Sequence, residues 1–250
     1  MESPGYSDIY EKLRVDCKNC SLGGICIPRG LDEDEIERVN KIIHRRRTLH
    51  KGDYLYRAGD SFESLLALKA GTVKIISSDS RGNDHIIGLF LPGEILGFGG
   101  VATGKHEYSA VVQDTVSVCE IPADRLEALC QEVPNLQHQL FQLMSCKLNQ
   151  ERCKIMMNKR PAEERMASFL VDLSERYHSR GFSAVEFSLS LTRQEIGNYL
   201  GLALETVSRL LSHFQDAGYI EIDRKQVVIK NLTGLKAIFS ADNRDDQKIA

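Results

Sequence analysis

The chain has 250 residues, of which 42% are hydrophobic and 27% are charged, and its formal net charge is −3. These proportions are ordinary for a folded protein in water, and the length allows two modest domains. No apolar run approaches the ~20 residues that a membrane-spanning helix needs. The net charge gives no general attraction to nucleic acid, so any DNA binding must come from a local surface, and we expect no membrane partner.

Three of the seven cysteines, Cys17, Cys20 and Cys26, lie close together near the N-terminus, and Cys119 follows much later in the chain. Thiolates are soft ligands that suit iron–sulfur clusters and zinc. The two-residue spacing lets the thiols of Cys17 and Cys20 reach one metal centre, and a pair of glycines before Cys26 lets the backbone turn so that Cys26 can join them. Three thiolates leave a fourth ligand position open, and we predict that Cys119 fills it.

Two other uses of these cysteines stay open on spacing alone. A zinc site of four thiolates normally uses two closely spaced cysteine pairs, and the second pair is missing here. Disulfides conflict with the odd number of cysteines and with a polar N-terminal sequence that lacks the apolar segment of a secretory signal. We therefore expect free thiols in a reducing cytoplasm, with an iron–sulfur cluster favoured over zinc.

The first half of the chain changes from a helical to a strand-like pattern. Residues 31–43 have an amphipathic helical pattern, and Asp32 is placed to cap its start. From residue 50 onward, short β-rich runs alternate with turns of Gly, Asp, Asn and Pro, which is typical of an antiparallel barrel or sandwich. We assign residues 1–30 to a cysteine-rich, cluster-binding arm and residues 31–130 to a β-roll sensor domain.

A long helical stretch is predicted over residues 123–158, and we assign residues 131–159 to a dimerisation helix. Intervals of three and four residues, as in a coiled-coil seam, separate Phe141, Met144, Leu148, Glu151 and Ile155. In a homodimer, two Glu151 carboxylates would face each other, which costs energy. The pattern predicts a marginal homodimer. The alternative is a helix that packs only on its own subunit and leaves Glu151 in water.

The C-terminal part predicts a winged helix-turn-helix domain at residues 160–235 and a polar tail at residues 236–250. A capping box opens a helix at Thr192 that Gly201 ends, and a second helix covers residues 204–217. A β-hairpin wing follows the second helix. The apolar residues expected to bury the inner faces of the two helices are Ile196, Leu200, Leu202, Val207, Leu210, Leu211 and Phe214.

The second helix carries the residues predicted to read DNA. Glu205, Ser208 and Arg209 share one face of its N-terminal half, which is the half that enters the major groove. Arginine suits the two acceptors of guanine and glutamate accepts from the cytosine amine, while Thr206 and Ser212 can contact phosphates. The alternative is a solvated helix face with an incidental Glu–Arg pair. Because basic and acidic residues balance here, two copies on half-sites ~34 Å apart should be needed for firm binding.

Several motifs occur together along the chain. They are Cys-x-x-Cys-x-x-x-x-x-Cys over residues 17–26, Val118-Cys119-Glu120-Ile121-Pro122, Pro134-Asn135-Leu136, Ala162-Glu163-Glu164-Arg165, Arg180-Gly181-Phe182-Ser183, Ile196-Gly197-Asn198-Tyr199-Leu200-Gly201-Leu202 and Glu205-Thr206-Val207-Ser208-Arg209. With the order of jelly roll, long helix and winged helix-turn-helix, they resemble the bacterial CRP/FNR regulators over essentially the whole chain. The motifs are most similar to the FNR branch of oxygen-responsive fumarate and nitrate reduction regulators and their Anr relatives.

This resemblance implies an α+β fold, a 4Fe–4S cluster on Cys17, Cys20, Cys26 and Cys119, and a homodimer while the cluster is intact. Oxygen would degrade the cluster toward 2Fe–2S, and the dimer and DNA binding would be lost. The resemblance further implies palindromic promoter DNA of the TTGAT…ATCAA type and RNA polymerase as partners. It implies activation and repression of genes for anaerobic metabolism and no enzymatic activity. The acidic seam residue of the family falls on Glu151.

The chain departs from the family pattern in places. Cys130, Cys146 and Cys153 are extra cysteines; we expect the first in the core and the other two on the helix face away from the seam. The stretch over residues 154–160 is one residue shorter than usual. Cyclic-nucleotide receptors of this fold need an arginine that holds the phosphate, and Tyr108 stands at that position, so we expect no cyclic nucleotide to bind.

Overall fold

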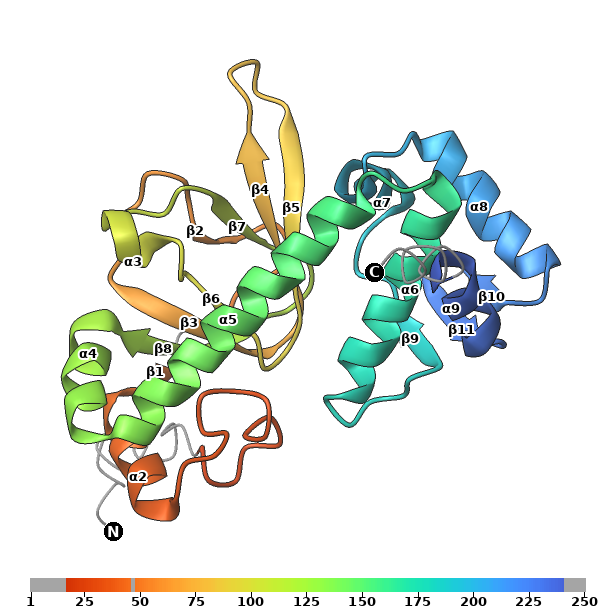
Figure 1. Ribbon diagram of the computed structural model, residues 1–250. Coiled ribbons are helices and arrows are strands. Elements are labelled where there is room, and N and C mark those ends of the chain that lie inside the picture. The colour runs from red at the N-terminus through yellow and green to blue at the C-terminus, as the bar shows by residue number, and fades with distance from the viewer. Residues whose placement is uncertain (1–16, 46–47, 241–250) are drawn as a thin grey trace, which may run out of the picture. The chain divides into compact units, whose positions relative to one another are not determined.

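The computed structural model describes residues 17–45 and 48–240. The chain divides after Cys146 into two compact units, and Figure 1 labels the helices and strands of each. The first unit is built on two antiparallel sheets, and the second is mostly helical with one small sheet. No helix in the described part of the chain is both long and apolar enough to cross a membrane.

The first unit contains the β-roll that the turn-rich pattern predicts. Its elements are α2 (Glu33–Ile42), β1 (His44–Arg45), β2 (Tyr54–Tyr56), β3 (Ser64–Ala70), β4 (Val73–Ser78), β5 (Asp84–Phe90), β6 (Ile95–Leu96), α3 (Gly100–Thr103), β7 (Ser109–Val112), β8 (Ser117–Pro122), α4 (Ala123–Glu132) and the start of α5 (Pro134–Met157). One sheet has the strand order β1-β8-β3-β6 and the other has the order β2-β7-β4-β5. All of their strand pairs are antiparallel.

Strand β3 is buried on both faces, which explains why four apolar residues follow one another in it. Leu65 and Ala67 belong to one apolar core, together with residues of the cysteine arm and of α2, α4 and α5. Leu66 and Leu68 belong to a second core between the two sheets. Alternate side chains of a strand point to opposite faces, so β3 separates the two cores and ties the arm side of the unit to the roll.

Helix α2 begins at the capping residue that its sequence predicts. The Glu35 N–H donates to Asp32 Oδ1 at 2.9 Å, and the Asp32 N–H donates to Glu35 Oε2 at 2.9 Å. This reciprocal box satisfies two backbone donors that the first turn of a helix otherwise leaves unpaired. The prediction for Asp32 is therefore confirmed.

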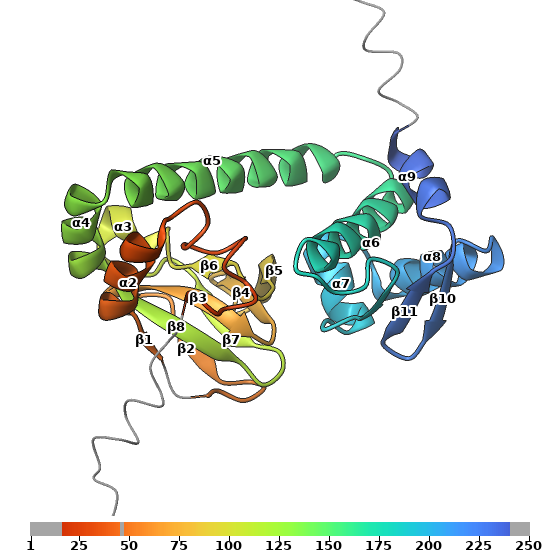
Figure 2. The ribbon, with the colours of Figure 1, turned by 90° about the horizontal axis from the view of Figure 1, so that it is seen from below.

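The single long helix predicted over residues 123–158 is wrong at one point. Helix α4 ends at Glu132 and α5 begins at Pro134, because the residue before a proline is sterically excluded from the helical region. Val133 accordingly has φ −128° and ψ 84°, and its side chain is buried in the first core. From Pro134 onward, α5 is one continuous helix of 24 residues, as Figure 2 shows along its length.

The second unit contains α6 (Ala162–His178), β9 (Glu186–Ser188), α7 (Arg193–Leu200), α8 (Leu204–Asp216), β10 (Ile220–Asp223), β11 (Gln226–Ile229) and α9 (Leu232–Ser240). The predicted hairpin wing is present as the antiparallel pair β10–β11, and the unpredicted strand β9 pairs with β11 to extend it to a three-stranded sheet. At three residues, β9 is too short to show a strand pattern in the sequence. Helix α9 runs past the boundary expected at residue 235, and residues 241–250 of the expected tail lie outside the described residues.

Helices α7 and α8 form the predicted helix-turn-helix. The Glu195 N–H donates to Thr192 Oγ1 at 3.2 Å and the Thr192 N–H donates to Glu195 Oε2 at 2.8 Å, which confirms the capping box. Gly201 ends α7 with φ +63°, a left-handed conformation that favours glycine. Of the seven apolar residues expected inside, Leu202 and Leu210 are only partly buried and the other five are buried.

Gly197 is the tightest point of this motif. The Leu202 N–H donates to the Gly197 carbonyl at 2.8 Å, and a Cβ atom at Gly197 would lie 2.6 Å from the Leu202 carbonyl oxygen. Backbone cannot move aside as a flexible side chain can. The turn between α7 and α8 therefore requires glycine at this position.

We predict that Gly197→Ala lowers the free energy of unfolding of the second unit by about 1–3 kcal/mol, because the added methyl overpacks the turn. Chemical denaturation followed by far-UV circular dichroism measures the effect. Gly99→Ala is the matched control, because a Cβ atom at Gly99 meets nothing within 4 Å. Equal denaturation midpoints for the two variants would contradict the prediction.

Candidate functional site

Four cysteines from two separate segments line one pocket in the first unit. Cys17, Cys20 and Cys26 come from the arm, and Cys119 comes from β8. The pocket has an empty volume of about 470 Å³, which includes space open to solvent. Most of its other lining residues are apolar, and Lys69 is the charged residue among them. The structure thus brings together the four residues that the sequence singled out as ligands.

The arm is a series of tight turns that direct its three thiols toward the pocket. The Cys20 N–H donates to the Cys17 carbonyl at 3.3 Å, the Gly23 N–H to the Cys20 carbonyl at 3.0 Å, and the Cys26 N–H to the Leu22 carbonyl at 3.0 Å. The Cys17 N–H donates to Asn40 Oδ1 on α2 at 3.0 Å. The backbone of the arm is therefore held both by itself and by α2.

Cys119 is fixed by the sheet. It is paired with Arg45 on β1 and with Ala67 on β3, so its strand has a neighbour on each side. A central strand cannot shift along its neighbours without breaking both ladders of hydrogen bonds. The fourth thiol is consequently a rigid reference point against which the arm is placed.

Burial controls the protonation of Cys26. Removal from water raises the pKa of its thiol to about 12, a hydrogen bond with the Ile27 backbone opposes this rise, and the nearby Cys119 and Cys20 add to it. The thiol is therefore neutral at pH 7 when nothing is bound. A cationic ligand would have to displace the proton and would compensate the charge of the thiolate.

The donor set fits an iron–sulfur cluster by its chemistry. All four candidate ligands are cysteine sulfur atoms. Within residues 17–45 and 48–240, no three His, Cys, Asp or Glu side chains are grouped closely enough to hold a single metal ion. A four-iron cluster takes one thiolate on each of its irons, so its ligands surround a larger object than one ion.

The three further cysteines are outside this pocket. Cys130 is half-buried and packs against the first core, and burial is the main cause that raises the pKa of its thiol. Cys146 and Cys153 are exposed on α5. They thus form a natural comparison set for tests of the four pocket cysteines.

Helix α5 presents an exposed apolar row along the predicted seam. Phe141 and Leu148 are each 62% exposed, Ile155 is 61% exposed and Met144 is 40% exposed. Large apolar side chains at this spacing and exposure are what a partner helix would cover. These side chains are exposed in the single chain and are therefore accessible to a partner helix.

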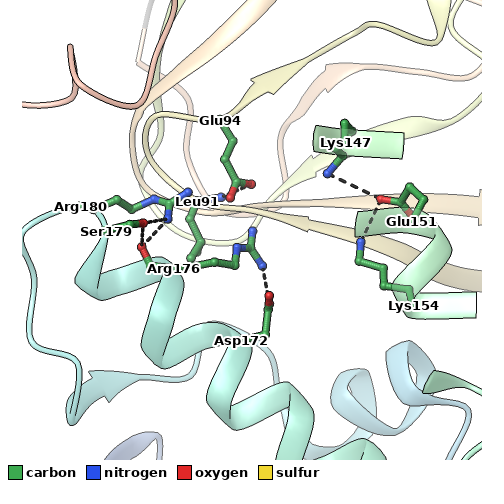
Figure 3. Close-up of polar contacts among 9 residues, drawn as sticks. All are labelled: Leu91, Glu94, Lys147, Glu151, Lys154, Asp172, Arg176, Ser179 and Arg180. Atoms are coloured by element: carbon green, nitrogen blue, oxygen red, sulfur yellow. Dashed lines mark hydrogen bonds and ion pairs between the residues drawn. The ribbon is translucent and has the colours of Figure 1, made fainter. Parts of the chain in front are cut away.

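Glu151 forms ion pairs with two lysines of the same helix. Its Oε1 atom lies 3.0 Å from Lys154 Nζ and 3.6 Å from Lys147 Nζ, and Figure 3 shows both lysines pointing at it. Figure 3 also shows the Asp172–Arg176 pair within α6, at 3.1 Å. The sequence reasoning missed the two lysines, although their positions four residues before and three residues after Glu151 were a usable signal.

The predicted DNA-reading residues lie on the outer face of α8. Glu205, Arg209 and Ser212 are exposed, and Thr206 and Ser208 are partly exposed. The opposite face is buried through Val207, Leu211 and Phe214. A duplex could therefore be contacted by this row without disturbing the core of the helix-turn-helix.

Comparisons with known proteins match this architecture. A family model described as "Cyclic nucleotide-binding domain" matches residues 46–133, and one described as "Crp-like helix-turn-helix domain" matches residues 164–238. The chain is 42% identical over 226 residues to "Transcriptional activator protein anr" of Pseudomonas aeruginosa, covering 90% of this chain and 93% of that protein. The chain belongs to the CRP/FNR family, as a regulator of the FNR/Anr type.

Two further relatives support this assignment. The chain is 40% identical over 225 residues to "Fumarate and nitrate reduction regulatory protein" of Salmonella typhimurium, covering 90% of each chain. The solved structure of FixK2 from Bradyrhizobium japonicum is similar with a TM-score of 0.70 and 26% identity, covering 78% of this chain and 96% of that one. This member of the family is thus a DNA-binding transcription regulator and not an enzyme, and the predicted α+β fold is confirmed.

The match to the cyclic nucleotide-binding model identifies the β-roll. Tyr108, at the position where a receptor needs arginine, precedes β7 and is 42% exposed. The expectation that no cyclic nucleotide binds stays a prediction.

Proposed function

We propose that this family member is an oxygen-responsive regulator of genes for anaerobic metabolism. In the proposal, it binds palindromic promoter DNA as a homodimer while Cys17, Cys20, Cys26 and Cys119 hold a 4Fe–4S cluster, and oxygen switches it off. The observation that supports this most is the convergence of four thiols from two distant segments on one pocket. The names of its relatives, which refer to fumarate and nitrate reduction, agree with the proposal.

When bound, the cluster would supply an oxygen-sensitive iron–sulfur centre. The residues of the chain do the rest. Thiolates of the arm and of β8 would hold the cluster, Asn40 holds the backbone at Cys17, and the strand pairing of Cys119 keeps one side of the pocket fixed. Occupancy would therefore decide how firmly the arm is fastened to the sheet.

The arm also touches the beginning of α5. Gly30, with φ +77°, lies so close to α5 that a Cβ atom would be 2.7 Å from Gln139 Nε2. The Asn135 amide donates to Glu35 Oε1 at 2.8 Å and so joins α5 to α2. Movement of the arm would consequently change the contacts at the N-terminal end of α5.

A small effect at this end of α5 is enough to control pairing. The seam of α5 combines exposed apolar residues with the charged Glu151, so the free energy of dimerisation is a balance of opposing contributions. A change of ~1.4 kcal/mol shifts such an equilibrium tenfold. Firm binding to a palindrome requires two copies of α8, so dimerisation would control DNA binding. We further propose that the protein acts in the cytoplasm, with RNA polymerase as its partner at activated promoters.

One anaerobic experiment tests the proposal. Protein reconstituted without oxygen should show a broad visible absorption, about four irons and four sulfides per chain, a dimer in sedimentation and binding to a TTGAT…ATCAA palindrome. After exposure to air, all four properties should decline together. Operator affinity that is the same before and after removal of the iron would exclude the proposal.

We predict that Cys119→Ser prevents stable cluster binding, because an alcohol is a poor substitute for a soft thiolate ligand on iron. Iron and sulfide counts after anaerobic reconstitution measure this. Cys130→Ser is the matched control, since it removes a half-buried thiol of the same unit that does not line the pocket. A dark, dimeric Cys119→Ser protein would show that the ligand assignment is wrong.

We predict that Glu151→Ala strengthens self-association of the cluster-free protein about tenfold, because it removes like charges from the two facing seams. Sedimentation velocity across a concentration series gives the dimer dissociation constant. Gln150→Ala, one residue away and outside the seam, is the control. An unchanged constant for Glu151→Ala would favour the alternative in which Glu151 stays in water.

We predict that Arg209→Ala lowers operator affinity by about tenfold or more and relaxes the preference at one base of each half-site. Arg209 is exposed, so the fold should survive the change. Ser212→Ala should weaken binding to all operator sequences by the same factor, because phosphate contacts carry no sequence information. This factor should be smaller than the loss for Arg209→Ala. Fluorescence anisotropy with an operator series separates the two outcomes, and an unchanged base preference for Arg209→Ala would exclude it as a base-reading residue.

A further inference from the structure

Lys154 lies in the second unit, near the C-terminal end of α5, between the seam acid and the helix-turn-helix. Its Nζ atom is 3.0 Å from Glu151 Oε1. The same ammonium is 5.9 Å from the centroid of the Tyr199 ring, on α7. A cation at this distance from an aromatic face is attracted by the ring. One charge therefore contacts both the proposed dimer seam and the first helix of the DNA-binding motif.

The Lys154 side chain is a charged ammonium at neutral pH, because its pKa is raised. Burial by itself lowers the pKa of Lys154, but its neighbours Tyr199 and Glu151 outweigh burial, so the pKa is raised. Burial also raises the pKa of the Tyr199 phenol, and Lys154 opposes that rise through its charge and a hydrogen bond. At neutral pH the pair is thus an ammonium beside a neutral phenol, with the Glu151 carboxylate on the other side.

Lys154 is partly buried, and the residues around its contact with Tyr199 are themselves fixed. Its side chain is only 33% exposed. The Tyr199 ring also makes an edge-on contact with the Phe169 ring of α6, with centroids 5.9 Å apart. The end of α7 is fastened to α6 by Arg165, whose Nη1 donates to the Leu200 carbonyl at 2.6 Å.

The chain leaves α5 through consecutive tight turns. The Asn158 N–H donates to the Lys154 carbonyl at 2.9 Å, and the Arg160 N–H donates to the Met157 carbonyl at 2.9 Å. A shift of the Lys154 head group would therefore change its distance from the Tyr199 ring on α7.

We propose that Lys154 is a positioning residue that couples pairing at the Glu151 seam to the pose of α7. Pairing of two seams removes Glu151 from water, which strengthens its attraction to the ammonium. The ammonium is then drawn closer to Glu151, and its distance from the Tyr199 ring changes. The inference rests on the proposed function in one respect, that the Glu151 row is the dimer seam.

Hydrogen exchange of the α7 amides at residues 196–200 tests the link in the full-length, cluster-free chain. Glu151→Gln should raise their exchange rates roughly two- to fourfold, because Lys154 loses its fixed end. Lys154→Met should raise them by a similar factor, and Glu151→Gln should add nothing in that background. Circular dichroism confirms that each variant is folded.

Two matched variants separate positioning from a general loss of charge. Lys154→Arg should exchange like the unaltered chain, because a guanidinium also pairs with a carboxylate and stacks on an aromatic ring. Lys147→Met removes the other lysine from the same carboxylate and should change the α7 rates by less than Lys154→Met. Equal effects of Glu151→Gln in both backgrounds, or no effect of Lys154→Met, would overturn the inference.

The outcome is independent of the test of the proposed function. Exchange in the cluster-free chain needs neither DNA nor dimer, so it reports on the link even where the anaerobic operator experiment fails. Conversely, a protein that binds its operator only with an intact cluster while Lys154→Met leaves α7 unchanged would keep the proposed function and exclude this residue.

Discussion

The position of Cys119 in the middle of a sheet is the constraint on which the rest of the first unit depends. Strand β8 is hydrogen-bonded to β1 and β3, and the arm curls so that its three thiols reach the same pocket. The thiol of Cys26 is buried and strongly disposed to keep its proton. In the proposed function, a cluster would have to displace this proton, and its presence would change how firmly the arm is held.

The cysteine arm and α2 both contact the beginning of α5. The backbone of Gly30 lies against Gln139, and Asn135 is hydrogen-bonded to Glu35 on α2. Neither contact is large. In the proposed dimer, modest coupling would suffice because exposed apolar side chains would favour pairing and Glu151 would oppose it. The two lysines beside Glu151 would reduce the repulsion between facing seams, so the penalty would be smaller than for two isolated carboxylates.

Local patterns predicted much of the fold. The predicted cap at Asp32 and the predicted capping box at Thr192 are both present, and Glu35 completes a box at Asp32 as well. Two errors have different causes. The break at Val133 had a visible signal in Pro134, whereas β9 is a strand because it pairs with β11 and carries too few residues to show a period of its own.

The sequence by itself determined the order of the elements, the caps, the buried faces of α7 and α8 and the spacing of the seam, because each depends on residues a few positions apart. Only the tertiary structure decided which distant groups meet. Cys119 on β8 lines the same pocket as the cysteines of the arm, and the Lys154 ammonium at the end of α5 lies over the Tyr199 ring of α7. Such contacts depend on strand order and helix packing, which no short stretch of sequence contains.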